Sequence, residues 1–324
     1  MEGIYNYMIK HGLLLCSFQA KKKYSGDDKD LIGLNSSYQF DENVYNDFSE
    51  MLMQFMEEFE SFHDNEQLMK MFAISKDSVN ITDKGTYNLI SCIVLSGAYG
   101  IESEMTNKDT KEVVYSRKKE DADIKPFQLL VYIPKDAEGD TVVKGIFAFE
   151  TIGNYGVKTI TMENMRRYFS ENLGITLQTR SISVQVFIEK LLREEKMSRI
   201  TLIRNVISQD PADSILITAG REEKTYIKPK LKDDWIKKVI GYISGSVSDE
   251  QVLEIDDTSY GDIKFTFSHG GRTKTVSLRD IDRFSLVEDL PTSLYPNGNV
   301  DRDKMVKHIE EIVKDYAKKI VFTV

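Results

Sequence analysis

Long apolar runs and cysteines are scarce in this sequence, and each scarcity excludes a class of protein. The longest apolar stretches, such as residues 90–98, are far shorter than the roughly 20 residues that a membrane-spanning helix needs. The apolar patch at residues 13–16 lacks the long apolar region and the cleavage site of a signal peptide. The two cysteines, Cys16 and Cys92, lie within apolar runs, which predicts buried reduced thiols and a cytoplasmic location.

Histidine is also rare, and this argues against several kinds of catalytic site. The four histidines are His11, His63, His269 and His308, and no two of them have metal-ligand spacing. No serine lies in a G-x-S-x-G motif, and neither cysteine has a histidine near it in the sequence. The sequence therefore favours neither a zinc enzyme nor a serine or thiol hydrolase, and it predicts no metal site and no cofactor.

The chain has 324 residues, 41% of them hydrophobic and 29% charged, which predicts a globular protein of about two domains. The net charge of −9 argues against a surface that is basic all over. The charge is uneven, however, because residues 41–66 hold nine acids and no Lys or Arg, whereas residues 144–204 hold ten Lys/Arg and six acids. The basic middle segment would complement either a polyanion or the acidic segment of the same chain, and charge balance within the chain is the commoner case.

Periodicity predicts the secondary structure. An opening strand is expected at 11–19, and a helix from the N-cap Asp41 to Phe62, with apolar residues at three- and four-residue steps. Residues 72–150 alternate apolar and turn-forming segments, which is typical of antiparallel strands. A helix at 161–173, a strand at 175–182, a helix from Ser183 and a strand at 197–207 follow.

The pattern of the second half of the chain predicts a smaller structural unit. Residues 209–232 contain DPAD, Gly220 and a charged run, and they are interpreted as a domain boundary. Beyond them we expect a helix at 235–243, a hairpin of strands at 264–267 and 273–278, and a helix at 301–319. The predicted fold class is α+β: a mixed, largely antiparallel sheet flanked by helices at 1–210, and a smaller C-terminal α+β domain at 221–324.

The stretch GNYGVKT at 153–159 looks like a phosphate loop but departs from the motif. A Walker loop has two glycines with four residues between them. Lys and Ser/Thr follow directly after the second glycine, where a helix begins. Gly153 and Gly156 are separated by only two residues, Val157 precedes Lys158, and the helix is expected to begin near Thr161. We therefore interpret the stretch as a tight turn at the end of a strand.

Two tripeptides resemble part of a metal-dependent nuclease site. Such sites use carboxylates to hold Mg²⁺ and a lysine, two residues from an acid, to stabilise the developing charge. Asp262 and Lys264 have this spacing and are the predicted catalytic pair, with Glu254, Asp256 and Asp257 upstream. Asp123 and Lys125 share the spacing, but Pro126 interrupts the strand that they would need.

Basic residues of the middle segment are the candidate nucleic-acid contacts. They are Lys158, Arg166, Arg167, Arg180, Arg199 and Arg204, with Tyr155 and Tyr168 offering stacking surface. Arg180 and Arg199 are expected on neighbouring elements of one exposed face. The alternative is an ordinary solvated face in which these residues pair with Glu163, Glu171 and Glu189.

Residues 126–204 resemble a set of largely uncharacterised bacterial proteins of similar length that are associated with antiphage defence. The resemblance rests on the order FQLLVYIP, KGIFAFETIGNYGVKT, LGITLQTRSIS and KLLREEKMSRITLIR. It implies a bacterial, intracellular role, and it carries no reaction or catalytic residue.

Three functions remain open at this stage. The first is a binding module of a defence system that contacts DNA, RNA or a protein partner encoded nearby. The second is a metal-dependent nuclease that uses Asp262 and Lys264. The third is a structural subunit whose apolar helices assemble a homo-oligomer. None of the three involves a membrane.

Overall fold

The structure is a computed structural model that describes residues 9–23, 30–138, 140–182, 188–189, 192–193, 197–207, 219–244, 246–256, 258–269, 272–280, 287–296 and 299–323. It confirms the predicted α+β class, with one large sheet and a smaller four-stranded sheet. The contacts within the chain define two compact units. Unit 1 comprises residues 1–179 and 287–324, and unit 2 comprises residues 180–286.

Unit 1 is built on a sheet with the strand order β13-β1-β11-β10-β7-β5-β4. The pairs β1–β11, β11–β10, β10–β7 and β7–β5 are all antiparallel. The strands are β1 (His11–Lys22), β4 (His63–Asn65), β5 (Lys70–Ile74), β6 (Asn80–Asp83), β7 (Tyr87–Ala98), β10 (Lys125–Pro134), β11 (Lys144–Ile152), β12 (Tyr155–Gly156), β13 (Ile175–Ser181) and β20 (Glu288–Asp289). Two hairpins form two-stranded sheets of their own: β2 (Tyr38–Phe40) with β3 (Asn43–Tyr45), and β8 (Ser103–Thr106) with β9 (Val113–Arg117).

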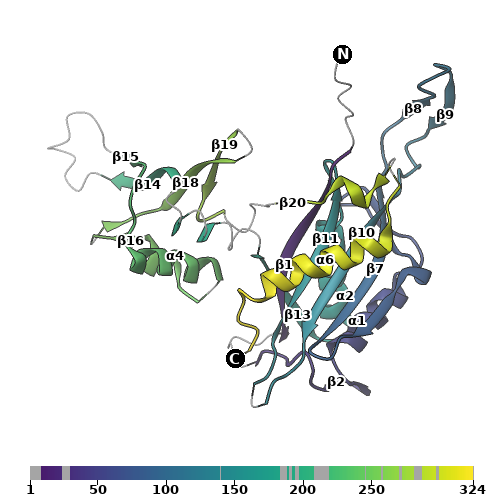
Figure 1. Cartoon of the computed structure of the whole chain (residues 1–324), viewed down its shortest axis with the longest axis horizontal. Helices are drawn as coiled ribbons and strands as arrows, with labels where there is room; N and C mark the ends of the chain where they lie inside the picture. The colour runs from purple at the N-terminus through teal and green to yellow at the C-terminus, as the bar shows by residue number, and fades with distance from the viewer. Residues whose placement is uncertain are drawn as a thin grey trace. The chain divides into compact units, whose positions relative to one another are not determined.

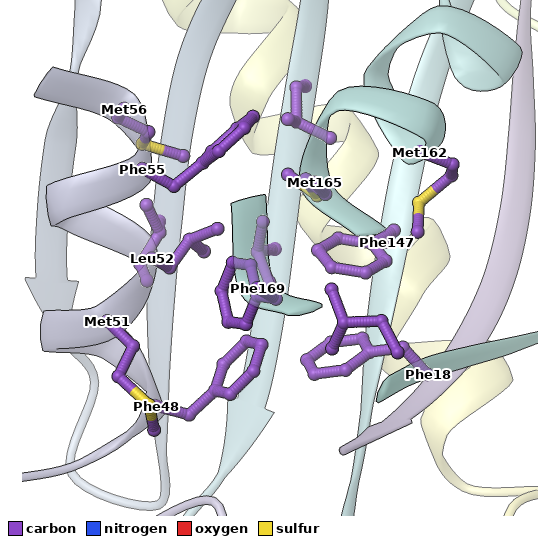
Figure 2. Packing of buried hydrophobic residues seen from close by; sticks show 14 of the residues in the cluster. Phe18, Phe48, Met51, Leu52, Phe55, Met56, Phe147, Met162, Met165 and Phe169 are labelled. Carbon is purple, nitrogen blue, oxygen red and sulfur yellow. The ribbon is translucent and has the colours of Figure 1, made fainter. Parts of the chain in front are cut away.

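Helices cover both faces of this sheet. The helices α1 (Phe48–Glu58) and α2 (Lys158–Asn172) lie on one face, and α6 (Arg302–Ala317) crosses the opposite face (Figure 1). Successive side chains of a strand point to opposite faces of the sheet. Since helices cover both faces, the long strands carry apolar side chains on both sides, as is usual for a sheet buried on two faces. Phenylalanines from α1, α2 and the sheet meet in the larger core, where Phe18 and Phe147 stack with ring centroids 4.2 Å apart (Figure 2).

Helix α1 is shorter than its apolar periodicity predicts. The N-cap is Asp47, whose carboxylate accepts a hydrogen bond of 2.9 Å from the backbone N–H of Glu50. The predicted cap, Asp41, has a φ of 51° in the turn between β2 and β3. The prediction of a helix over 41–62 was wrong at both ends, because Val44 and Phe62 continue the spacing by coincidence and are 63% and 48% exposed.

Residues 287–323 return to unit 1, and this places the last helix differently from the predicted domain at 221–324. Strand β20 pairs with β1 at Gly12 and Leu13, and the backbone N–H of Val143 donates to Phe322 O at 2.9 Å. Helix α6 has the predicted start, since Asp301 caps it by accepting from Lys304 N at 3.1 Å. The apolar stripe of α6 was predictable, but the sheet that buries it belongs to unit 1.

A buried carboxylate holds this returning segment. Glu150 on β11 has no solvent exposure, and it contacts His11 Nδ1 at 2.5 Å and Arg302 at 2.6 Å. It also accepts a hydrogen bond of 2.7 Å from the backbone N–H of Gln128. Burial alone would raise the pKa of Glu150, but the hydrogen bond from His11 and the charge of Arg302 outweigh burial, and the pKa lies below its ordinary value.

Unit 2 is the smaller α+β unit. Its antiparallel sheet has the order β15-β14-β18-β19, formed by β14 (Met197–Ile207), β15 (Ala219–Ile227), β18 (Asp262–His269) and β19 (Arg272–Ser277). The other elements are α4 (Asp233–Ser244), α5 (Asp249–Leu253) and the hairpin of β16 (Glu254–Ile255) with β17 (Thr258–Ser259). The predicted strands at 197–207, 264–267 and 273–278 and the helix at 235–243 correspond to these elements.

The predicted boundary at 209–232 differs from the observed structure. Strand β15 lies within it and pairs with β14 over nine positions, from Arg199 opposite Ile227 to Ile207 opposite Ala219. Its many charges reflect an exposed strand, because residues 220–228 are all exposed. The predicted helix from Ser183 falls on residues that lie largely outside the described part of the chain.

Candidate nucleic-acid interface

Two of the three basic residues predicted on α2 donate hydrogen bonds within unit 1. Arg166 donates hydrogen bonds to Leu177 O at 3.4 Å and to Thr179 Oγ1 at 2.9 Å, which ties α2 to β13. Arg167 donates to Asn164 Oδ1 at 3.1 Å, and Lys158 is half-buried in the first turn of the helix. These contacts give the two arginines a structural role.

The basic residues predicted further along the chain lie on elements other than α2. Arg180 lies at the end of β13, whereas Arg199 and Arg204 lie on β14 of unit 2. Since side chains alternate along a strand, Arg199 and Arg204 point to opposite faces of β14. Arg204 forms an ion pair of 2.6 Å with Glu222 on β15.

The stretch GNYGVKT is a hairpin turn, as predicted. Tyr155 pairs with Ile152, and Gly153, at a φ of 58°, is one of the two residues between them. Helix α2 begins at Lys158, so the predicted start near Thr161 was three residues late. Lys125 lies over the ring of Tyr155, 4.6 Å from its centroid, and also forms an ion pair with Asp123. The second nuclease-like tripeptide thus has its charges paired with each other.

The predicted catalytic pair lies on β18 of unit 2. Both carboxylate oxygens of Asp262 accept from the hydroxyl of Ser277, at 2.9 and 2.8 Å, and one also accepts from Ile263 N at 2.8 Å. Lys264 is two residues along the same strand, opposite Thr201 on β14. Within the described ranges, no group of three or more His, Cys, Asp or Glu side chains is arranged to hold a metal ion. The geometry gives Asp262 the role of joining β18 to β19.

Unit 2 contains a cavity of about 300 Å³ that sequence reasoning did not predict. Ile200 and Leu202 on β14 and Ile255 on β16 give it an apolar wall. Two aromatic residues, Tyr226 at the end of β15 and Trp235 in the first turn of α4, also line it. The remaining lining residues are Pro229, Lys230, Leu231, Lys232 and Asp256. The volume is at the lower end of the range of about 300–1,000 Å³ that is usual for small-molecule sites.

The register of β14 and β15 builds this cavity. Tyr226 lies opposite Ile200 and Lys224 lies opposite Leu202, so all four side chains share one face of the sheet. The ammonium group of Lys224 is 5.3 Å from the ring centroid of Tyr226. A hydrogen bond with Tyr226, and more weakly the charge of Asp256, raise the pKa of Lys224, which stays protonated at neutral pH.

The two aromatic residues of the cavity differ in exposure. Tyr226 is 41% exposed at the mouth of the cavity. Trp235 packs against Phe265, with ring centroids 6.2 Å apart, and its buried Nε1 has no hydrogen-bond partner among the residues that the structure describes. An unsatisfied buried N–H is uncommon in native proteins.

The signal for this site was present in the sequence but divided between segments. Tyr226, Lys230 and Lys232 lie in a charged run that resembles a linker, and Trp235 is the single tryptophan of the chain. Only the pairing of β15 with β14 brings the tyrosine against the apolar residues of the sheet.

Comparisons of the chain with family models, with curated proteins and with solved structures find no match. Among the described residues, no helix is both long and apolar enough to cross a membrane.

Proposed function

We propose that the protein binds single-stranded nucleic acid through unit 2, and that the cavity beside β15 receives one unstacked base. The observation that carries the proposal is the combination of Tyr226 and Trp235 with Lys230 and Lys232 around one cavity. Proteins that bind single strands use aromatic side chains as stacking surfaces and lysines as contacts for the phosphates.

The charges of the two units support this location. Unit 2 contains 18 Lys/Arg and 17 Asp/Glu, whereas the rest of the chain contains 25 Lys/Arg and 35 Asp/Glu. A polyanion is repelled less by unit 2 than by unit 1. Of the six basic residues that the sequence indicated, Arg204 lies on the same strand face as Leu202, which lines the cavity.

The experiment uses Trp235 as the probe, since it is the only tryptophan and it lines the cavity. We expect short single-stranded oligonucleotides to change its fluorescence, with an affinity that falls steeply as salt is raised. Tyr226→Ala should weaken binding roughly tenfold or more, because stacking contributes about 1–3 kcal/mol per base.

Arg167→Ala on α2 is the matched control, since it removes a predicted contact from unit 1. Loss of binding in Arg167→Ala with no change in Tyr226→Ala would move the site to α2. A fluorescence signal that does not change with any oligonucleotide at low salt would contradict the proposal.

The biological setting that we propose is antiphage defence in bacteria, as the resemblance of residues 126–204 implies. If so, the chain should lower the plating efficiency of phage in a bacterial host, and Tyr226→Ala should reduce that protection. Equal protection by both chains would separate the defence role from the cavity.

A contact with a protein partner or a second copy is the alternative, and one feature of unit 1 favours it. The β8–β9 hairpin extends from the rest of unit 1 (Figure 1), and Val113, Val114 and Tyr115 on it are 50%, 65% and 48% exposed. Exposed apolar residues gathered on one element are typical of interaction sites. Light scattering tests self-association, and a mass of 37.2 kDa at every concentration would argue against a homo-oligomer.

A further inference from the structure

One acidic residue lines the cavity that is otherwise suited to an anionic ligand. Asp256 occupies the turn between β16 and β17, where its φ of 48° is tolerated by aspartate better than by most residues. Its negative carboxylate repels the phosphates of a nucleic acid, and the positive charges of the lysines that line the cavity offset that repulsion. Asp256 is exposed, so its carboxylate is free to accept hydrogen bonds from donors of a ligand in the cavity.

The bases differ in the donors that they offer. An ionised carboxylate only accepts hydrogen bonds. Guanine presents two adjacent donors, N1–H and the N2 amino group, on its Watson–Crick edge. Adenine and cytosine place a ring acceptor beside their single amino group, and thymine and uracil place carbonyl oxygens on both sides of one N–H. Only guanine pairs with a carboxylate through two parallel hydrogen bonds, which is the stronger arrangement.

We propose that the cavity of unit 2 selects guanine, with the carboxylate of Asp256 accepting from N1–H and the N2 amino group. The inference rests on the proposed function, because it assigns a base to the same site. The two aromatic residues supply stacking, which every base can use. The guanine O6 remains as an acceptor, and the ammonium group of Lys230 or Lys232 can donate to it.

The test compares thymine hexamers that carry a single guanine, adenine, cytosine or hypoxanthine in the middle. Affinities are taken from the midpoints of Trp235 fluorescence titrations, because the amplitude depends on the base. We expect the guanine hexamer to bind roughly tenfold or more tightly than the adenine and cytosine hexamers, as a two-bond contact to a base provides. Hypoxanthine, which lacks the N2 amino group, should lose much of that advantage.

Asp256→Asn should remove the preference, because an amide offers one acceptor and one donor. Asparagine also tolerates the positive φ at this turn, so the variant should fold. Asp234→Asn is the matched control: this exposed acid lies in the first turn of α4 and is not among the residues that line the cavity. It should keep the preference for guanine.

The outcomes separate the two proposals. Hexamers that bind equally whatever their central base would overturn the guanine inference and leave single-strand binding intact. A guanine preference that survives in Asp256→Asn would show that another group reads the base, and would also overturn it. Failure of every hexamer to bind would remove both proposals together.

Discussion

The two units use their sheets for different purposes. In unit 1, α1 and α2 cover one face and α6 covers the other, so that both faces of the strands are apolar. In unit 2, apolar residues of α4 pack on one face of the sheet. The opposite face carries threonines, with hydrogen bonds of 3.1 Å between Thr201 and Thr225 and between Thr266 and Thr275.

The two units differ in what their charged side chains contact and in whether a cavity lies beside them. Charged groups in unit 1 fasten one part of the fold to another, as Arg166 joins α2 to β13 and Glu150 holds the C-terminal segment. In unit 2 the exposed strand β15 ends beside the start of α4, and the space between them is the cavity. Because Arg166 and Arg167 of α2 donate hydrogen bonds within unit 1, unit 2 with its cavity is the better candidate for a ligand site.

The largest expected effect is a loss of stability in unit 1 that leaves the stability of unit 2 unchanged. Phe169 is fully buried where α2 meets α1 and the sheet (Figure 2), so Phe169→Ala should destabilise unit 1 by about 3–5 kcal/mol. Far-UV circular dichroism follows both units, whereas the fluorescence of Trp235 follows unit 2 alone. We expect the dichroism transition to move to lower temperature and the Trp235 transition to stay. A joint shift would show that the units unfold together.

The next effect concerns the segment that returns to unit 1. Arg302→Met should destabilise unit 1 by about 3 kcal/mol, because it leaves the buried carboxylate of Glu150 with one fewer partner. Lys304→Met, at an exposed position on the same helix, is the control and should change little.

The same cluster predicts a dependence on pH. The folded pKa of Glu150 lies below the ordinary value of 4.5, so its contribution to stability is present above that pH and is lost as pH falls through the folded value. In Glu150→Gln, unfolding by urea should therefore depend less on pH below 4.5. An unchanged dependence would mean that other carboxylates dominate the acid unfolding of unit 1.

The smallest effect tests the nuclease alternative in unit 2. Asp262→Ala should destabilise unit 2 by about 1–2 kcal/mol, read from Trp235, because the Ser277 hydroxyl and a backbone N–H lose their acceptor. The nuclease hypothesis predicts instead that the same change abolishes a Mg²⁺- or Mn²⁺-dependent cleavage of DNA or RNA. Cleavage that is present in the wild type and persists in Asp262→Ala would remove Asp262 from the catalytic role.

Much of the secondary structure could be predicted because it depends on local pattern. The α6 stripe and its Asp301 cap, the strands from β7 to β11, and the turn at Gly153 are all local features. Errors occurred where a local pattern has two meanings. Val44 fits a helical spacing but lies in a hairpin, and the charged run around Tyr226 resembles a linker but is a strand.

The sequence by itself determined the fold class and the two buried thiols. Cys16 and Cys92 are both fully buried and free, and burial raises their pKa values to about 11 and about 12. The fold class and the burial of the thiols follow from which residues are apolar and from the spacing of those residues, and the sequence shows both the residue types and their spacing.

Only the tertiary structure decided which sheet buries α6, which cations are engaged on α2, and that Tyr226, Trp235 and Asp256 share a cavity. The physical reason is that an apolar face specifies that it must be buried but does not specify against what. A site assembled from β15, α4 and the β16–β17 turn depends on strand register and on chain reversals, which no spacing within one segment encodes.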